Sequence, residues 1–299
     1  MSTSLNATAC RDVLTWFDDS ERDLPWRRPG VPPWQILVSE VMLQQTPVVR
    51  VEPVWRAWVA RWPNPAALAA ASPGDAVRAW GRLGYPRRAM RLHACAQAIV
   101  DRHGGEVPAG VDELLALPGI GDYTARAVAC FAFGQPVPVV DINVRRVLAR
   151  AGSGVAEAGN PAVARDLAAA SAALDTVPAR RRPRLCAALM ELGALVCTAR
   201  SPRCDECPVR GSCAWRAAGS PAWAGPTRRT QAFEGTDRQA RGRLLDVLRS
   251  SDGPVPRAAL DVAWDRDPGQ RDRALDSLLV DGLIEQTGDG WFALAGEAG

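Results

Sequence analysis

The stretch of sequence that decides the fold is LPGIGDYTARAV, residues 117–128. Apolar positions recur at helical spacing before it, in residues 111–117, and from within it onward, in residues 122–133. The glycines between these segments favour a tight turn, because Gly119 and Gly121 can adopt backbone angles that other residues avoid. Free backbone amides at the start of the second helix can bind an anion such as phosphate. We therefore expect two helices joined by a phosphate-binding turn, although ordinary interhelical connections share this pattern.

Helical periodicity continues on both sides of this stretch, over the first 215 residues. Short joints rich in Pro and Gly separate the periodic segments. Besides the two above, the expected helices are residues 10–18, 35–45, 52–62, 75–83, 88–102, 142–150, 162–174 and 184–197. The run from Val137 to Val140 resembles a strand, but its two prolines exclude a central strand of a sheet. This part of the chain is predicted to be all-α.

Residues 216–235 have the composition of a linker, and a different pattern follows them. The expected elements are helices at residues 238–250, 256–264 and 270–281 and a β-hairpin at 283–294 that turns at Gly288-Asp289-Gly290. Three helices followed by a hairpin are typical of a winged helix. Residues 236–299 are therefore predicted to form a small winged-helix-like module.

The composition is that of a folded protein. Of the 299 residues, 47% are hydrophobic and 23% are charged, which excludes collagen-like and wholly disordered chains. No apolar run reaches the roughly 18 residues that a membrane-spanning helix needs. The first residues lack the basic and apolar segments of a secretory signal. We therefore expect a cytoplasmic protein with no membrane partner.

Charge is distributed unevenly along the chain. All 36 basic residues are arginine, so no lysine side chain is present to form a Schiff base. Residues 1–235 hold 28 arginines against 21 acidic residues, whereas residues 236–299 hold 8 against 12. The net charges are therefore +7 and −4. A basic body suits a polyanionic partner, and an acidic C-terminal part does not.

Four of the eight cysteines form the strongest motif in the chain, namely Cys197, Cys204, Cys207 and Cys213. The other four cysteines are scattered over helices, like ordinary buried thiols. A zinc site, the main alternative, usually pairs two short Cys-x2-Cys motifs. Here only Cys204 and Cys207 have that spacing. The pattern therefore favours an all-cysteine [4Fe–4S] cluster over zinc.

This cysteine spacing, with LPGIGDYTARAV and with VVDINVRRVLAR at residues 139–150, resembles the helix-hairpin-helix DNA glycosylases that carry a [4Fe–4S] cluster. Within that superfamily, the segment SEVMLQQT at residues 39–46 is similar to adenine DNA glycosylases of the MutY type. The similarity covers about residues 10–215. It implies a helix-hairpin-helix glycosylase fold, with the winged-helix-like module added after it.

The resemblance also implies a domain organisation. A six-helix barrel module is expected at about residues 22–133, and an iron–sulfur module from residues 1–21 and 134–215. The linker at 216–235 and the module at 236–299 follow. Long relatives end in a Nudix-like domain, which three helices and a hairpin cannot form. Because the C-terminal module is acidic, we expect it not to read DNA itself and to serve as a protein contact.

Two carboxyl groups are candidates for the chemistry. Releasing adenine requires a proton for the departing base and stabilisation of a cationic sugar, which two acids in different surroundings can supply. Glu40 lies in an apolar helix; a helix-surface location is the alternative, but the resemblance makes it the proton donor. Asp141 can be simply a helix N-cap, but the resemblance makes it the aspartate that faces the sugar. Asn143 matches a residue that orients water and the carboxyl groups. Tyr123 replaces the lysine of lyase-active endonuclease III-type relatives, which implies no β-lyase activity.

Several polar residues are candidates for DNA contacts. Gln44, Gln45 and Thr46 end a helix, where polar side chains can enter a duplex or be plain helix-end residues. The resemblance implies that Gln44 and Thr46 contact the base opposite adenine and that Gln45 is a wedge. Tyr85 matches an intercalating tyrosine, and Arg27 matches a residue near the flipped adenine.

The sequence therefore predicts a monomeric base-excision-repair enzyme that removes adenine opposite 8-oxoguanine or guanine in double-stranded DNA. We expect it at the nucleoid when bound to DNA, with arginines in residues 87–91 and 145–150 contacting phosphates. One alternative is a pyrimidine-lesion glycosylase of the endonuclease III type. Another is a non-catalytic iron–sulfur DNA-binding sensor, against which the acidic tail and the intact pair of acids argue.

Overall fold

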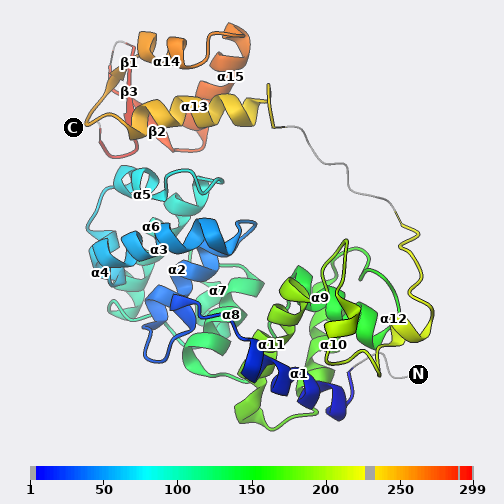
Figure 1. Ribbon diagram of the computed structural model, residues 1–299. Helices are drawn as coiled ribbons and strands as arrows, with labels where there is room; N and C mark the ends of the chain where they lie inside the picture. The colour runs from blue at the N-terminus through cyan, green and yellow to red at the C-terminus, as the bar shows by residue number, and fades with distance from the viewer. Residues whose placement is uncertain (1–4, 226–232, 289, 298–299) are drawn as a thin grey trace. The chain divides into compact units, whose positions relative to one another are not determined.

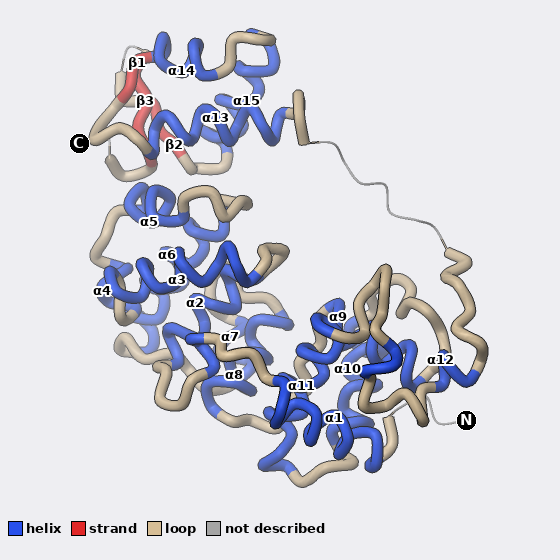
Figure 2. Tube along the Cα trace, viewed as in Figure 1, coloured by secondary structure: helices blue, strands red, loops and turns tan. Residues whose placement is uncertain are grey.

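The computed structural model describes residues 5–225, 233–288 and 290–297, which belong to two compact units (Figure 1). The first unit comprises residues 1–36, 109–112 and 121–227, and the second comprises residues 37–108, 113–120 and 228–299. Helices make up most of both units, and the strands of the described residues all lie near the C-terminus (Figure 2). The predicted all-α fold with a small C-terminal module is confirmed.

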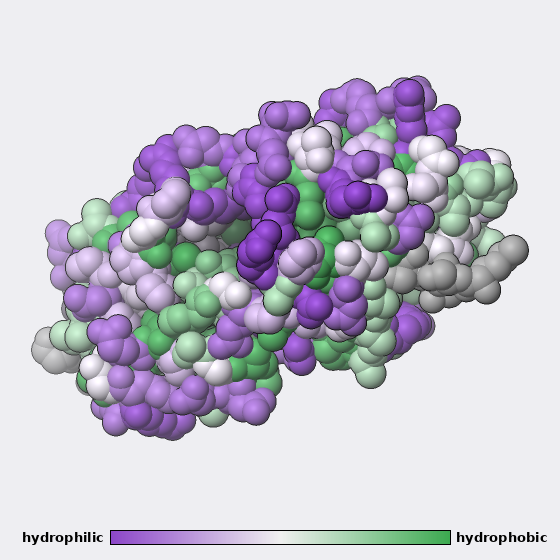
Figure 3. Space-filling model, turned by 90° about the horizontal axis from the view of Figure 1, so that it is seen from below, coloured by the Kyte–Doolittle hydropathy of each residue, from purple (hydrophilic) through white to green (hydrophobic). Residues whose placement is uncertain are grey.

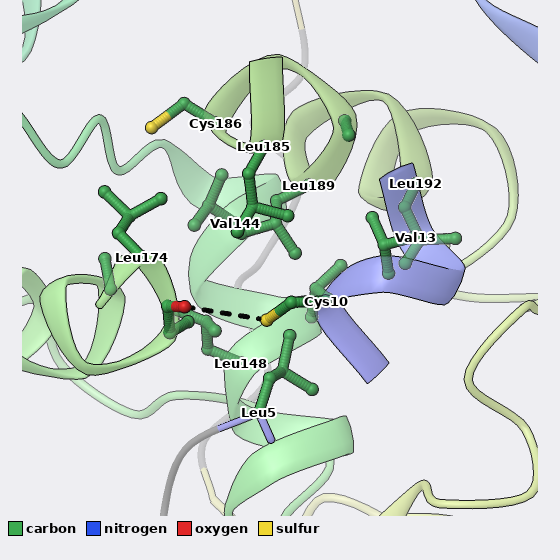
Figure 4. Close-up of a cluster of buried hydrophobic side chains, with 14 of the residues drawn as sticks. Leu5, Cys10, Val13, Val144, Leu148, Leu174, Leu185, Cys186, Leu189 and Leu192 are labelled. Atoms are coloured by element: carbon green, nitrogen blue, oxygen red, sulfur yellow. Dashed lines mark hydrogen bonds between the residues drawn. The ribbon is translucent and has the colours of Figure 1, made fainter. Parts of the chain in front are cut away.

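The first unit is built around one helical core. Its elements are α1 (Ala7–Ser20), α8 (Asp122–Phe133), α9 (Ile142–Val147), a π-helical turn (Leu148–Gly152), α10 (Val163–Leu174), α11 (Arg182–Leu195) and α12 (Ala214–Ala217). Both α1 and α9 pack against α11. Figure 4 shows Cys10 and Val13 of α1 among leucines of α10 and α11, with the Cys10 thiol 3.6 Å from the Ala173 carbonyl oxygen.

The second unit contains the remaining helices of the N-terminal half. They are α2 (Pro33–Leu43), which begins in the first unit, α3 (Val48–Arg61), α4 (Pro65–Ala69), α5 (Pro73–Trp80), α6 (Arg87–His103) and α7 (Val111–Leu115). The buried indole of Trp58 meets Trp62 and Trp80 edge-on, with ring centroids 4.7 and 5.6 Å away. Ser72 and Asp75 form a capping box that starts α5. This packing holds α3, α5 and α6 around one apolar centre.

The C-terminal module also belongs to the second unit. It consists of α13 (Asp237–Arg249), β1 (Val255–Pro256), α14 (Arg257–Ala263), α15 (Pro268–Val280), β2 (Ile284–Gln286) and β3 (Trp291–Leu294). The strands form an antiparallel sheet in the order β1-β3-β2, in which Phe292 of β3 pairs with Val255 and with Gln286. The three helices and the hairpin agree with the predicted pattern. Asp289, in the expected hairpin turn, lies outside the described residues.

Local differences from the sequence-based elements have simple causes. The helix expected at residues 142–150 ends at Val147 and continues as the π-helical turn, a feature that periodicity does not reveal. The five-residue α4 and the two-residue β1 are too short to produce a periodic pattern. Within the expected linker, α12 extends to Ala217, and residues 226–232 lie outside the described residues.

The described residues contain no helix long and apolar enough to span a membrane. The face drawn in Figure 3 is mostly hydrophilic, with apolar side chains in small groups. This agrees with the absence of a long apolar run in the sequence.

Candidate active site and nucleic-acid interface

Asp141 is held at both of its carboxylate oxygens. It is the N-cap of α9, and its Oδ1 accepts a hydrogen bond of 2.7 Å from the Val144 amide. Its Oδ2 accepts a 2.7 Å hydrogen bond from Nδ2 of Asn143. Burial raises the pKa of Asp141, although these hydrogen bonds and the charge of Arg146 oppose the rise. The N-cap interpretation and the catalytic one are compatible, because capping fixes the carboxylate in one orientation.

Asn143 connects this carboxylate to α11. Its Oδ1 accepts a 2.7 Å hydrogen bond from Nη2 of Arg146, which also donates to the Gly193 carbonyl at 2.7 Å. The Nε of Arg146 donates to the carbonyl of Cys197 at 2.6 Å. A Cβ added at Gly193 would lie only 2.6 Å from Cβ of Asn143. The sequence pattern did not single out Gly193, although it sets how closely α11 approaches Asn143.

The four cysteines of the motif lie together at the end of α11. They surround a small cavity that is also lined by Val147, Val196 and Trp215. Burial and the charges of the other three thiols raise the pKa of Cys207 to about 11. Cysteine binds a metal centre as the thiolate, so four such ligands favour a cationic centre that neutralises their charge. The cysteine set therefore fits a positively charged inorganic group.

Arg150 organises the backbone of the cysteine loop. Its guanidinium donates to the carbonyls of Ala156, Thr198 and Ala199 and lies 3.6 Å from Sγ of Cys197. It also lies over the Trp215 ring, 4.8 Å from the centroid. Arg146 and Arg150 are both buried. The expectation that these two arginines contact phosphates is therefore wrong, because burial and carbonyl partners occupy their charged groups.

Glu40 is buried in the second unit. It lies in α2 with only 5% of its surface exposed, between Ser39 and Val41, which are buried as well. A helix-surface location, the alternative left open by the sequence, is excluded. Asp141 belongs to the first unit.

Arg88 joins the two loops that carry the candidate intercalating residues. Its guanidinium donates to the Gln44 carbonyl at 2.7 Å, to Oγ1 of Thr46 at 2.9 Å and to the Gly84 carbonyl at 3.1 Å. It also lies 5.5 Å from the Tyr85 ring centroid. Arg88 is buried, so it positions these loops and is not the exposed phosphate contact expected from the sequence.

Gln45 and Tyr85 share an unusual backbone conformation. Their φ angles are +55° and +50°, and among the described non-glycine residues only Ser220 has another positive φ. Such conformations are strained for residues with a Cβ and cluster at functional sites. Gln45 is exposed and Tyr85 is 42% exposed. Both side chains are thus presented from strained turns that Arg88 holds together.

The turn between α7 and α8 only partly matches the expectation. Gly119 has a φ of +77°, and a Cβ there would lie 2.6 Å from Cβ of Arg91, so glycine is required twice over. Gly121 instead has an extended backbone that any residue can adopt, so the expectation of an unusual angle there is wrong. Gly121 is the N-cap of α8, and no side-chain hydrogen bond caps that helix end.

The other two candidates belong to the first unit. Tyr123 lies in the first turn of α8, half-buried against the core of that unit. Arg27 ends the 3-10 turn Pro25–Arg27, and its guanidinium forms a 3.1 Å ion pair with Glu191. Glu191 is fully buried and also pairs with Arg22 at 2.6 Å. Burial alone would raise the pKa of Glu191, but these two arginines hold it below the usual value.

Comparisons with known proteins agree with this arrangement. Residues 38–170 match the HhH-GPD superfamily of base excision DNA repair proteins, and residues 197–213 match the iron–sulfur binding domain of endonuclease III. The second match begins and ends at the first and last cysteines of the motif. The cysteines therefore form an iron–sulfur domain, and the cofactor is a [4Fe–4S] cluster.

Relatives and a solved structure extend the similarity. The chain is 64% identical over 286 residues to an adenine DNA glycosylase of Mycolicibacterium smegmatis, covering 96% of each protein. It is 61% identical over 287 residues to one of Mycobacterium tuberculosis, covering 96% of this chain and 93% of the relative. A thermostable thymine-DNA glycosylase aligns with a TM-score of 0.62 and 26% identity, over 70% of this chain and 95% of its own. On identity across nearly the whole length, this chain belongs to the adenine DNA glycosylases, DNA N-glycosylases of the HhH-GPD superfamily.

Proposed function

We propose that the enzyme removes adenine paired with 8-oxoguanine or guanine in double-stranded DNA, by hydrolysis and without cutting the strand. The observation that carries the proposal is the Asp141 carboxylate, fixed at both oxygens by Val144 and Asn143. A preorganised carboxylate is what a developing positive charge on a sugar requires. Membership of the adenine glycosylase family supports adenine as the base that leaves.

The two acids have different tasks in this reaction. Glu40 donates a proton to a ring nitrogen of adenine as the glycosidic bond breaks and its electron pair leaves with the base. Asp141 faces the resulting oxocarbenium sugar and stabilises its charge. Water then adds to the sugar carbon, and Asn143 orients it together with the carboxylate. The burial of Glu40 and the two hydrogen bonds that orient the Asp141 carboxylate support this division of roles.

The DNA is held by the candidate interface of the second unit and by the turn before α8. Gln44 and Thr46 contact the base opposite adenine, and Gln45 and Tyr85 enter the duplex where the adenine has left the stack. Strained backbone at Gln45 and Tyr85 supports this assignment. The turn that ends at Gly121, before the first residues of α8, contacts a phosphate.

The absence of strand cleavage follows from the available nucleophiles. A β-lyase forms a Schiff base between an amine and the sugar. Tyr123 stands where lyase-active relatives have lysine, and the chain contains no lysine at all. Only the terminal amine remains, so base release leaves an intact strand with an abasic site.

Arg27 is proposed to lie near the flipped adenine, as the resemblance implies. Its ion pair with Glu191 directs the guanidinium to a buried acid, although 22% of the side chain remains exposed. We assign it to the adenine pocket as a residue whose orientation Glu191 sets.

The enzyme is proposed to act as a monomer in the cytoplasm, and at the nucleoid when it is bound to DNA. Its proposed modules are the six-helix barrel at about residues 22–133, the iron–sulfur module at 1–21 and 134–215, and the C-terminal module at 236–299.

A single-turnover assay tests the proposal. Duplexes containing A:8-oxoguanine, A:guanine and a thymine mispair are incubated with excess enzyme, and each sample is analysed with and without alkali. We expect strand breaks only after alkali and only from the adenine-containing duplexes. Breaks without alkali would contradict the monofunctional mechanism, and release of thymine alone would favour the pyrimidine-lesion alternative. Tight binding without any base release would favour the sensor.

A further inference from the structure

The C-terminal module packs against α5 through reciprocal capping by two arginines. The guanidinium of Arg78 in α5 donates to carbonyls at the end of α13, those of Leu248, Arg249 and Ser251. In return, Nε of Arg249 donates to the Val77 carbonyl of α5 at 3.1 Å. Burial lowers the pKa of Arg249 to about 10, so this contact excludes water.

Three acidic residues of the module form ion pairs across this contact. Asp246 pairs with Arg82 at 2.9 Å. Asp281, at the end of α15, lies 3.4 Å from Arg87 of α6, and Glu297 lies 2.6 Å from Arg78. The module, which was expected to contact a protein, therefore contacts another part of its own chain. The excess of acid in the module complements arginines around α5 and α6.

The backbones also meet. The amide of Gly74 donates to the Ala295 carbonyl at 2.7 Å. A Cβ at Gly74 would lie 2.8 Å from that carbonyl oxygen, so the contact needs glycine although the position is helical. No larger side chain fits there without moving the module.

This contact brings α13 to the candidate intercalating residue. The guanidinium of Arg238, in the first turn of α13, lies over the Tyr85 ring, 4.8 Å from its centroid. Arg88 contacts the same ring from α6, at 5.5 Å. Tyr85 has a strained backbone and a partly exposed side chain, so contacts to its ring decide where the ring points.

We propose that Arg238 is a positioning residue for Tyr85 and that the C-terminal module thereby acts on mispair recognition. The module holds the ring by a cation–π contact while its own side chains need not touch a base. This inference rests on the proposed function, because it takes Tyr85 to enter the duplex.

The test compares Arg238→Ala, Arg238→Gln and Arg238→Lys in the full-length protein, with Arg243→Ala as the matched control. Arg243 is an exposed arginine of the same helix. It lies five residues after Arg238, so it projects from a different side of α13. The duplex carries 2-aminopurine beside the base opposite adenine, so that insertion of Tyr85 changes its fluorescence. Duplex affinity is measured in the same samples.

We expect Arg238→Ala and Arg238→Gln to weaken affinity about 2- to 5-fold, as for an exposed cation–π contact. The 2-aminopurine response should fall in parallel, and Arg238→Lys, which keeps the cation, should restore most of both signals. Arg243→Ala should match the wild type. Gly74→Ala, which displaces the module while adding a good helix former, should reproduce the Arg238→Ala effect.

Coupling to Tyr85 separates positioning from a direct phosphate contact. In a Tyr85→Leu background, Arg238→Ala should cause no further loss. An equal loss in both backgrounds, an unchanged Arg238→Ala protein, or a larger fluorescence response in that variant would each overturn the proposal. Failure of the proposed function is distinct, because the wild-type protein would then release no adenine.

Discussion

At the scale of single residues, the site depends on carboxyl groups in unlike surroundings. Glu40 is buried within α2, whereas Asp141 caps α9 and accepts two hydrogen bonds that hold its carboxylate in one orientation.

Glu40→Gln and Asp141→Asn are each expected to slow adenine release by ~10²–10⁴-fold or more, because each removes one acid of the pair. Both substitutions keep side-chain volume, so duplex binding should survive. Single-turnover rates and binding to an uncleavable duplex measure the two effects separately. Near wild-type turnover of either variant would show that the role belongs to another residue.

Glu191 is expected to contribute to stability through its two ion pairs. Its pKa is held below the ordinary value, so its ion pairs with Arg22 and Arg27 contribute stability above about pH 4.5 and lose it as the pH falls through the folded-state pKa. Glu191→Gln should lower the free energy of unfolding by about 2 kcal/mol at pH 7, less than a fully buried pair because Arg22 remains partly solvated.

The difference between wild type and Glu191→Gln should shrink below about pH 4.5, which denaturant unfolding at several pH values can follow. Glu206→Gln is the matched control, because Glu206 forms an exposed ion pair with Arg203. That variant should change stability little. A Glu191 effect that stays constant down to pH 3 would exclude the ion pairs as its cause.

At the scale of elements, the approach of α11 to α9 determines the geometry around Asp141. A Cβ at Gly193 would lie 2.6 Å from Cβ of Asn143 and 2.8 Å from its carbonyl oxygen. Asn143 in turn holds Oδ2 of Asp141. The distance between α9 and α11 therefore affects the position of Asn143, and through it the orientation of the Asp141 carboxylate.

Gly193→Ala should lower stability by about 1–3 kcal/mol through overpacking and should also slow adenine release. Gly242→Ala is the control, because Gly242 is a glycine within α13 with open space around its Cβ position. It should stabilise the protein by up to ~1 kcal/mol and leave catalysis unchanged. Thermal unfolding and single-turnover rates distinguish the two positions. Normal catalysis by Gly193→Ala would show that the packing of α11 does not control the Asp141 carboxylate.

At the scale of the whole molecule, the iron–sulfur domain is expected to support DNA binding and not bond cleavage. Arg146 and Arg150 tie the cysteine loop to α9 and to the π-helical turn. Loss of the cluster should therefore loosen the first unit.

Purified protein should be brown and hold about four irons per chain. Cys207→Ser should lower iron content, melting temperature and duplex affinity together, whereas Cys95→Ser, at a buried cysteine outside the motif, should leave iron unchanged. Iron analysis and calorimetry provide the measurements. A colourless, zinc-loaded and fully active wild-type preparation would falsify the assignment of the cluster.

Periodicity, capping residues and cysteine spacing were enough to locate most helices, the C-terminal module and the iron–sulfur loop. These features depend on residues close together in the chain, such as Asp141 and Val144. The same local signals placed Glu40 in an apolar helix, but its burial depended on packing. Short elements such as α4 and β1 were not predicted, because they have too few residues to show a repeating pattern.

Local spacing in the sequence predicted the fold class and the cysteine motif, and the resemblance to a known family singled out the candidate acids. Which arginines are exposed depends instead on tertiary packing. Arg88, Arg146 and Arg150 are identical in kind to the surface arginines, yet they bind backbone carbonyls 44 to 51 residues away in sequence. Arg78 finds its carbonyl partners even farther along, in the C-terminal module. A guanidinium has no local signal for its partner, since burial and distant carbonyls choose it only when the helices have packed.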